Sequence, residues 1–165
     1  MNTIEEQVSI KDPLGVDIFA GFSAHDLEQI AKSCIQRTYQ AGECCAVQGE
    51  TANELCIVNG GKVAIELRIE IAPYTQTIGI GTLTRGNVFA WCALLEPHVL
   101  TCSARCILRA QIICIKASDL QHIFKERPSL ERVVMKNLVT VISSRLTDIE
   151  IQLVCLVTEM IKQGK

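Results

Sequence analysis

The sequence lacks several patterns that commonly indicate function. It has no C-x-x-C pair, so the usual ligand spacings of zinc and iron–sulfur sites are missing. No apolar run is long enough to span a bilayer, and no stretch supplies the basic face that nucleic acid requires. We therefore expect no metal site, no membrane insertion and no direct contact with nucleic acid.

The first residues, MNTIEEQVSIKDPL, carry acids and have no apolar core, unlike a secretory signal peptide. The 165 residues have the length of one domain, 48% of them are apolar, and the formal net charge is −2. A chain of this composition can bury a core without disulfides or metals. We expect a single folded domain in the cytoplasm.

Nine cysteines are many for this length, but their number is odd and their spacing irregular. Cys102 and Cys106 would lie roughly 13 Å apart in an extended strand at about 3.3 Å per residue, too far for one metal ion. Most of the cysteines stand in apolar segments such as LCIV and IICI, which favours packing as small hydrophobic side chains. A redox role for the adjacent Cys44 and Cys45 is the alternative.

Three regions follow one another without a linker, and together they predict one domain over residues 1–165. Residues 14–34 have a helical pattern, with Ser23 as an N-cap before AHDLEQIAK. Residues 35–115 consist of short segments rich in Val, Ile, Thr and Cys between glycine-containing turns, which is typical of an all-β barrel or roll. Residues 117–163 return to a helical pattern. The predicted fold class is mainly β with flanking helices.

The last helix is predicted to be unusually long. Pro128 suits its first turn, and a helix from there to Lys162 would run roughly 50 Å at about 1.5 Å per residue. Its apolar residues recur every three or four positions, so we expect a homodimer through this face. A break near residues 143–144 that folds the helix back is the alternative. The residues assigned to the dimer helix are Leu138, Ile142, Leu146, Ile149, Leu153 and Leu156.

Several phrases in sequence resemble the cyclic-nucleotide-binding domain, the ligand module of catabolite activator proteins, kinase regulatory subunits and gated channels. These phrases are IFAGFSAHDLEQIA, YQAGECCAVQGETANELCIVNGGKVAI, GNVFAWCALLEP and IKASDLQHIFKERPSLERVV, in this order. The resemblance implies a double-stranded β-helix, that is, a jelly-roll-like β-roll, followed by a long C-terminal dimerisation helix. It also implies a cyclic nucleotide as the ligand.

In that family a Phe-Gly-Glu-x-Ala-Leu segment covers the nucleotide, its Glu holds the ribose, and a downstream Arg pairs with the phosphate. Here the glycine position is Ala90, the Glu position is Trp91, and the Arg position is Leu100. Arg105 lies five residues further on and is expected to point to the opposite face of its strand. The presumed pocket positions are Phe89, Ala90, Trp91, Cys92, Ala93, Leu100 and Thr101.

Losing both contacts would cost roughly 3–6 kcal/mol, or a factor on the order of a hundred to ten thousand in affinity. We therefore expect that the chain does not bind cyclic AMP or cyclic GMP in the usual pose. The cofactor is unknown: an apolar or aromatic metabolite, haem with His98 as a ligand, or no ligand at all stay open.

The leading hypothesis is a non-catalytic ligand-sensing or regulatory module that acts as a homodimer. We expect no helix–turn–helix domain after the last helix, and therefore expect a separate protein partner to carry any downstream activity. Two alternatives stay open: a structural or interaction homodimer with a vestigial pocket, and a genuine cyclic nucleotide binder with a non-standard pose. A metal-dependent enzyme of the cupin type is disfavoured because the chain has three histidines and no H-x-H pair.

Overall fold

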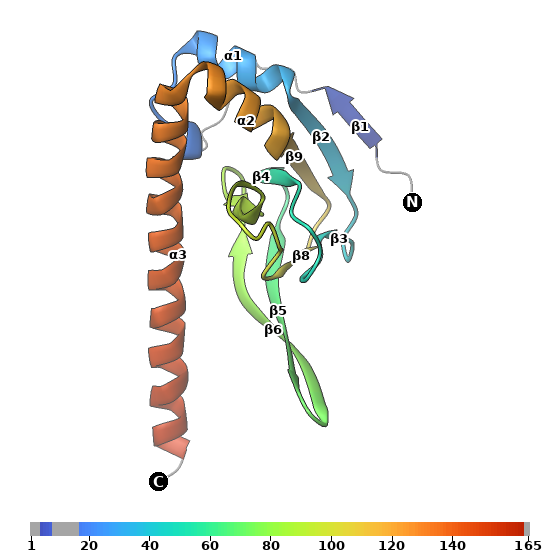
Figure 1. Ribbon diagram of the computed structural model, residues 1–165. Coiled ribbons are helices and arrows are strands. Elements are labelled where there is room, and N and C mark those ends of the chain that lie inside the picture. Colours follow the sequence, from blue (N-terminus) through green and yellow to red (C-terminus); the bar gives the residue numbers. More distant parts are fainter. Residues whose placement is uncertain (1–3, 8–16, 164–165) are drawn as a thin grey trace.

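The computed structural model describes residues 4–7 and 17–163 and arranges their strands in two antiparallel sheets (Figure 1). One sheet has five strands in the order β1-β2-β9-β4-β7, and the other has four in the order β3-β8-β5-β6. The strands are β1 (Ile4–Gln7), β2 (Cys34–Tyr39), β3 (Cys44–Ala46), β4 (Glu54–Gly60), β5 (Val63–Ile71), β6 (Tyr74–Leu83), β7 (Val88–Phe89), β8 (Ser103–Cys106) and β9 (Ala110–Lys116).

The helices flank strands β2–β9, except for one short turn between β7 and β8, so the predicted fold class is confirmed. They are the 3₁₀ turns η1 (Asp17–Phe19) and η2 (Trp91–Leu94) and the α-helices α1 (Ala24–Lys32), α2 (Ala117–Glu126) and α3 (Pro128–Gln163). Within the expected helical region 14–34, residues 14–16 lie outside the described residues, and Cys34 already belongs to β2. Strand β1, which pairs with β2, was not predicted.

Two clusters of buried side chains form most of the core. The roll core lies between the two sheets and contains Val58, Phe89, Ile112 and the cysteines Cys56, Cys106 and Cys114. The helix core lies between the five-stranded sheet and the helices, and it joins Leu55 and Ile115 to Leu120, Val134 and Leu138. The helices are therefore anchored on the outer face of the roll.

Helix α1 begins with the cap that the sequence predicts. The hydroxyl of Ser23 accepts a hydrogen bond from the backbone N–H of Asp26 (3.2 Å), and the Asp26 carboxylate accepts one from the backbone N–H of Ser23 (3.3 Å). This reciprocal pair satisfies two backbone donors that would otherwise be unpaired at the helix start. Asp26 also forms an ion pair with Arg127, which ties α1 to the end of α2.

Helix α3 is continuous over its 36 residues, roughly 54 Å at about 1.5 Å per residue. The proposed break near residues 143–144 is therefore wrong. Its first half packs on the helix core, where the Asn137 amide donates hydrogen bonds to the carbonyl oxygens of Ile18 (3.1 Å) and Ala20 (3.0 Å). Leu138 is only 2% exposed, so its assignment to the dimer face is also wrong: it is core in its own chain.

Beyond the first four turns, α3 runs past the roll without being covered by it (Figure 1). Ile142 is half-buried against the helix core, whereas the apolar side chains that follow are exposed. Among the latter are Leu146 (56% exposed), Leu153 and Leu156 (both 59%) and Met160 (71%). An isolated helix of this length with so many exposed apolar side chains needs a covering surface.

The cysteines are distributed mainly as packing residues. Cys34, Cys56, Cys106 and Cys114 are buried, and Cys155 on α3 is exposed. Burial raises the pKa of the Cys34 thiol to about 12, so this thiol is protonated and unreactive at neutral pH. Among the described residues, no three His, Cys, Asp or Glu side chains converge on a point that could hold a metal ion.

Candidate functional site

The segment after β7 forms a tight turn over the mouth of the roll. Its first residue, Ala90, has φ 56° and ψ 29°, in the left-handed region that favours glycine. The four residues after it form η2, which ends where the N–H of Leu95 donates to the carbonyl of Cys92 (3.1 Å). The backbone therefore keeps the glycine geometry that the resemblance implies, although the residue is alanine.

Leu100 is positioned by hydrogen bonds to the turn that precedes β4. The N–H of Leu100 donates to the carbonyl of Glu50 (2.9 Å), and the N–H of Gly49 donates to the carbonyl of Leu100 (2.8 Å). Gly49 has φ 88°, which allows this turn. Two chain segments fifty residues apart are thus fixed together, and they hold the Leu100 side chain at the wall of the roll.

A cavity of about 620 Å³, here called the lid cavity, lies between the roll and α3. Its roll side is formed by β5, β6, the β7–η2 segment and the start of β8, and its other side by α3. The residues from α3 are Ser144, Arg145, Asp148, Ile149, Ile151 and Gln152. A cavity of this volume falls within the range of small-molecule sites.

The lid cavity brings together most of the pocket positions predicted from the sequence. Those that line it are Phe89, Ala90, Trp91, Cys92, Leu100 and Thr101. Ala93 does not line it: this residue is 1% exposed and packs with Ala52 and Leu100. Ile149, which the sequence assigned to the dimer face, lines the cavity.

Trp91 and Leu100 narrow the cavity without filling it. Trp91 is half-buried, packs against the helix core and still lines the cavity. Leu100 is 9% exposed and lines the cavity as well. The residues that line the roll side carry no charge, so a ligand phosphate would find no ion-pair partner there.

Arg105 points away from the lid cavity, as expected from its position in the strand. Its guanidinium donates a hydrogen bond from Nε to the Glu66 carboxylate (2.9 Å) and another to the carbonyl of Gly42 (3.1 Å). Its neighbour Ala104 is buried and lines the cavity. Arg105 is therefore a structural residue of the outer face and does not replace the missing arginine.

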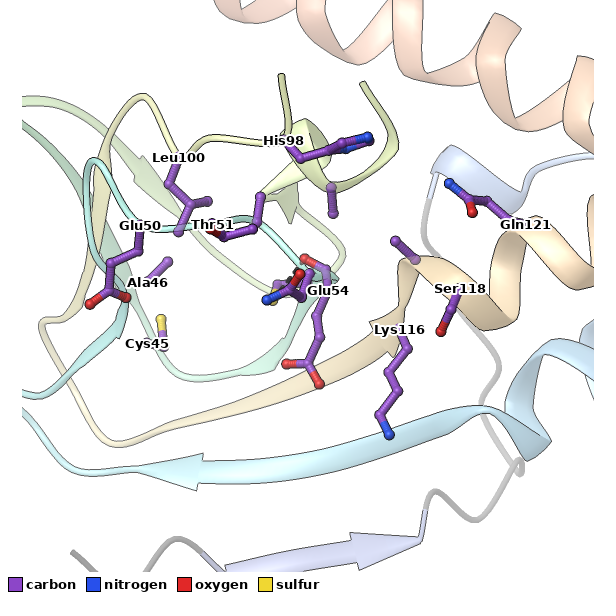
Figure 2. Close-up of a pocket in the computed structure, with 15 residues that line it drawn as sticks. Cys45, Ala46, Glu50, Thr51, Glu54, His98, Leu100, Lys116, Ser118 and Gln121 are labelled. Atoms are coloured by element: carbon purple, nitrogen blue, oxygen red, sulfur yellow. Dashed lines mark hydrogen bonds between the residues drawn. The ribbon is translucent and has the colours of Figure 1, made fainter. Parts of the chain in front are cut away.

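A second cavity of about 600 Å³, here called the loop cavity, lies beside the first residues of α2 (Figure 2). Figure 2 shows Ala46 and Leu100 at one side of it and Lys116, Ser118 and Gln121 at the other. Ala46 and Leu100 line both cavities and form part of the wall between them.

His98, which the sequence suggested as a possible haem ligand, lines the loop cavity. Its Nδ1 lies 3.2 Å from the carbonyl oxygen of Cys92. Glu54, in the same cavity, is paired with Arg37 through two contacts between guanidinium and carboxylate. His98 is thus outside the lid cavity, where haem would have needed it.

Sequence reasoning missed the residues that α3 contributes to the lid cavity. Arg145 and Asp148 lie within the apolar repeat of α3, but the repeat was assigned to a dimer face only. Their three-residue spacing places them on the same side of the helix. A polar pair beside an apolar stripe is common on helix surfaces, so the sequence offered no signal that this pair faces a cavity.

Comparison with known proteins identifies the family. Residues 36–127, more than half of the chain, match the model of the cyclic nucleotide-binding domain. The chain belongs to the cyclic nucleotide-binding domain family. The matched residues include every strand from β3 to β9 and all of the cassette, which is the segment Phe89–Leu95.

The relatives of this cyclic nucleotide-binding domain are distant. A cyclic nucleotide-binding domain from Methylobacillus flagellatus has a TM-score of 0.74 at 14% identity, covering 82% of this chain and 75% of that one. The regulatory subunit of a cAMP-independent protein kinase A from Trypanosoma brucei has a TM-score of 0.70 at 14% identity, covering 89% of this chain and 50% of that one.

A curated protein also matches over most of the domain. Glutaminase 1 of Bradyrhizobium diazoefficiens is 28% identical over 131 residues, which are 78% of this chain. The chain spans only 20% of the length of that glutaminase. The match therefore concerns a part of the glutaminase.

Proposed function

We propose that the protein is a non-catalytic regulatory module that senses a small molecule other than cyclic AMP or cyclic GMP. The observation that carries the proposal is the lid cavity, which keeps a ligand-sized volume between the roll and α3. The turn at Ala90 has the left-handed conformation that favours glycine, but Trp91 and Leu100 stand where the resemblance expects the carboxylate and the guanidinium that hold a nucleotide. A solved structure of the same fold is described as the regulatory subunit of a cAMP-independent protein kinase A, which is consistent with a role of this fold that does not depend on cyclic AMP.

Helix α3 is the element that would report occupancy of the cavity. Ile149 lines the cavity and is 43% exposed, whereas Leu146, Leu153 and Leu156 continue the apolar stripe away from it. We propose that this stripe pairs with the same stripe of a second chain. A ligand that contacts α3 in the lid cavity would then shift the helix that holds the dimer together, and a partner protein would recognise that change.

The proposal is tested by native mass spectrometry of the protein after incubation with a small-molecule extract of cells. Gly81 lines the cavity, and a Cβ atom added there meets no atom within 4 Å, so Gly81→Leu is the variant expected to occupy cavity space. Gly79 lies two residues away with equal space but outside the cavity lining, and Gly79→Leu is the matched control. We expect a mass increase from a bound small molecule, here called an adduct, for the native protein and for Gly79→Leu. No such increase is expected for Gly81→Leu.

A structural homodimer with a vestigial pocket is the second candidate function. The half-buried Trp91, which packs against the helix core and lines the cavity, favours it. An extract that leaves all three proteins without an adduct would contradict the sensing proposal and support this alternative. An adduct whose mass is that of cyclic AMP or cyclic GMP would support a nucleotide held in a non-standard pose.

A further inference from the structure

The two charged residues that line the lid cavity both come from α3. They are Arg145 and Asp148, while the roll contributes apolar side chains and neutral polar groups such as Thr82, Asn87 and Thr101. The charge that a ligand would meet is therefore carried by the helix, on the side opposite the family's usual phosphate position at Leu100.

Arg145 is half-buried and has unused hydrogen-bonding capacity. Among residues 17–163 its guanidinium makes no hydrogen bond or ion pair, and its electrostatic neighbour is Asp148, one turn along the helix. Burial lowers the pKa of this guanidinium from its usual value, and the charge of Asp148 opposes that change. A guanidinium stays charged at neutral pH even so, and a partly desolvated one gains from an anionic partner.

We propose that the lid cavity takes an apolar or aromatic small molecule that carries one anionic group, and that Arg145 of α3 pairs with this anion. The inference rests on the proposed sensing function and adds the chemical class of the ligand. The uncharged roll side holds the apolar body, and the guanidinium holds the anion. Asp148 makes the cavity neutral in sum, which disfavours a doubly charged group such as a phosphate monoester.

In this arrangement the ligand's anionic group contacts α3. The resemblance places a nucleotide phosphate beside Leu100, in the roll. Here the charged end of the ligand would bind directly to the helix whose stripe is proposed to dimerise. Occupancy would thus be coupled to the position of α3 by one ion pair.

Two fluorescent probes of similar shape distinguish the contribution of the anionic group to binding from that of the apolar body. Anilinonaphthalene sulfonate carries one anionic group, and N-phenylnaphthylamine has a closely similar aromatic body without it. Both are titrated into the full chain and four variants. Arg145→Gln removes the cation, Asp148→Asn removes the opposing carboxylate, Gly81→Leu fills the cavity, and the exposed Arg132→Gln on the same helix is the matched charge control.

We expect Arg145→Gln to lower the affinity for the sulfonate probe about tenfold, equivalent to about 1.4 kcal/mol. The affinity for the neutral probe should change less than twofold. Asp148→Asn should raise the affinity for the sulfonate probe, and Arg132→Gln should leave both affinities unchanged. Circular dichroism of each variant confirms that α3 is intact.

The remaining outcomes overturn the inference in distinguishable ways. In one outcome, both probes bind the native protein and bind Gly81→Leu more weakly, but Arg145→Gln changes the two affinities equally or not at all. The anion contact is then wrong, and the sensing function stands. If neither probe binds the native protein, or both bind Gly81→Leu as well as the native protein, the lid cavity is no ligand site and both proposals fail.

Discussion

At the scale of single residues, the cassette forms its turn at Ala90 although the side chains expected from the resemblance are replaced. Ala90 holds a left-handed conformation that glycine adopts without cost, at an expense of roughly 1–2 kcal/mol for other residues. The fold tolerates this strain, and so the turn persists although the glycine is replaced. The motif in the sequence therefore predicted the path of the chain, while the loss of the usual ligand stays a prediction.

Asp26 provides a prediction about pH at the same scale. Its hydrogen bond from the Ser23 hydroxyl (2.6 Å) and the nearby charge of Arg127 hold the pKa of the carboxyl below its usual value, although burial acts in the opposite direction. A carboxyl whose folded-state pKa is lowered stabilises the fold above its unfolded-state pKa of about 3.9. This contribution is lost as the pH falls through the folded-state value.

Asp26→Asn is therefore expected to lower the free energy of unfolding at pH 7, with a difference from the native protein that shrinks below about pH 4. Urea denaturation at pH 7, 5 and 3 measures it. Glu28→Gln, an exposed change on the same helix, is the control and should have little effect at any pH. A difference for Asp26→Asn that is equally large at pH 3 would contradict this account.

At the scale of elements, α3 shows where periodicity in a sequence is informative and where it is not. Apolar residues at intervals of three and four predicted one long helix, and α3 is that helix. The same pattern could not distinguish the residues that pack on the helix core, such as Leu138, from those left exposed, such as Leu153. That division depends on where the roll ends, which is a property of the tertiary structure.

Two adjacent residues of α3 test this division. Leu138→Ala removes a side chain that is 2% exposed and should cost about 2–5 kcal/mol of stability. Val139→Ala, at a neighbouring position that is 66% exposed, should change it by less than about 0.5 kcal/mol. Equilibrium unfolding in urea measures both. Equal losses would mean that α3 does not pack on the roll as described.

Strands β1 and β6 show that local sequence patterns also do not report contacts between distant parts of the chain. Glycine-containing turns predicted the roll as a whole, because glycine marks the places where the chain must reverse. The pairing of β1 with β2 joins residues 4–7 to residues 35–38, and no short-range pattern reports such a distant pairing. The cavity residues of β6, which include Gly81, were likewise invisible without the neighbouring α3.

At the scale of the whole molecule, the uncovered half of α3 is expected to bind a second copy. Leu153→Glu with Leu156→Glu places two charges in the exposed stripe and should convert a dimer into a monomer, because buried unpaired carboxylates are costly. Thr158→Glu, about half a turn away from the stripe, should leave the dimer intact. Sedimentation velocity distinguishes the states, and a native protein that is monomeric at all concentrations would contradict the prediction.

For the whole site, we propose that this cyclic nucleotide-binding domain lacks the usual nucleotide contacts, while a cavity remains beside Trp91 and Leu100. Isothermal titration calorimetry of cyclic AMP and cyclic GMP tests it most directly, on the native chain and on a double variant, Trp91→Glu with Leu100→Arg. We predict no measurable binding to the native chain and a gain on the order of a hundredfold or more in the double variant. Binding of either nucleotide to the native chain at micromolar concentration or tighter would contradict the claim.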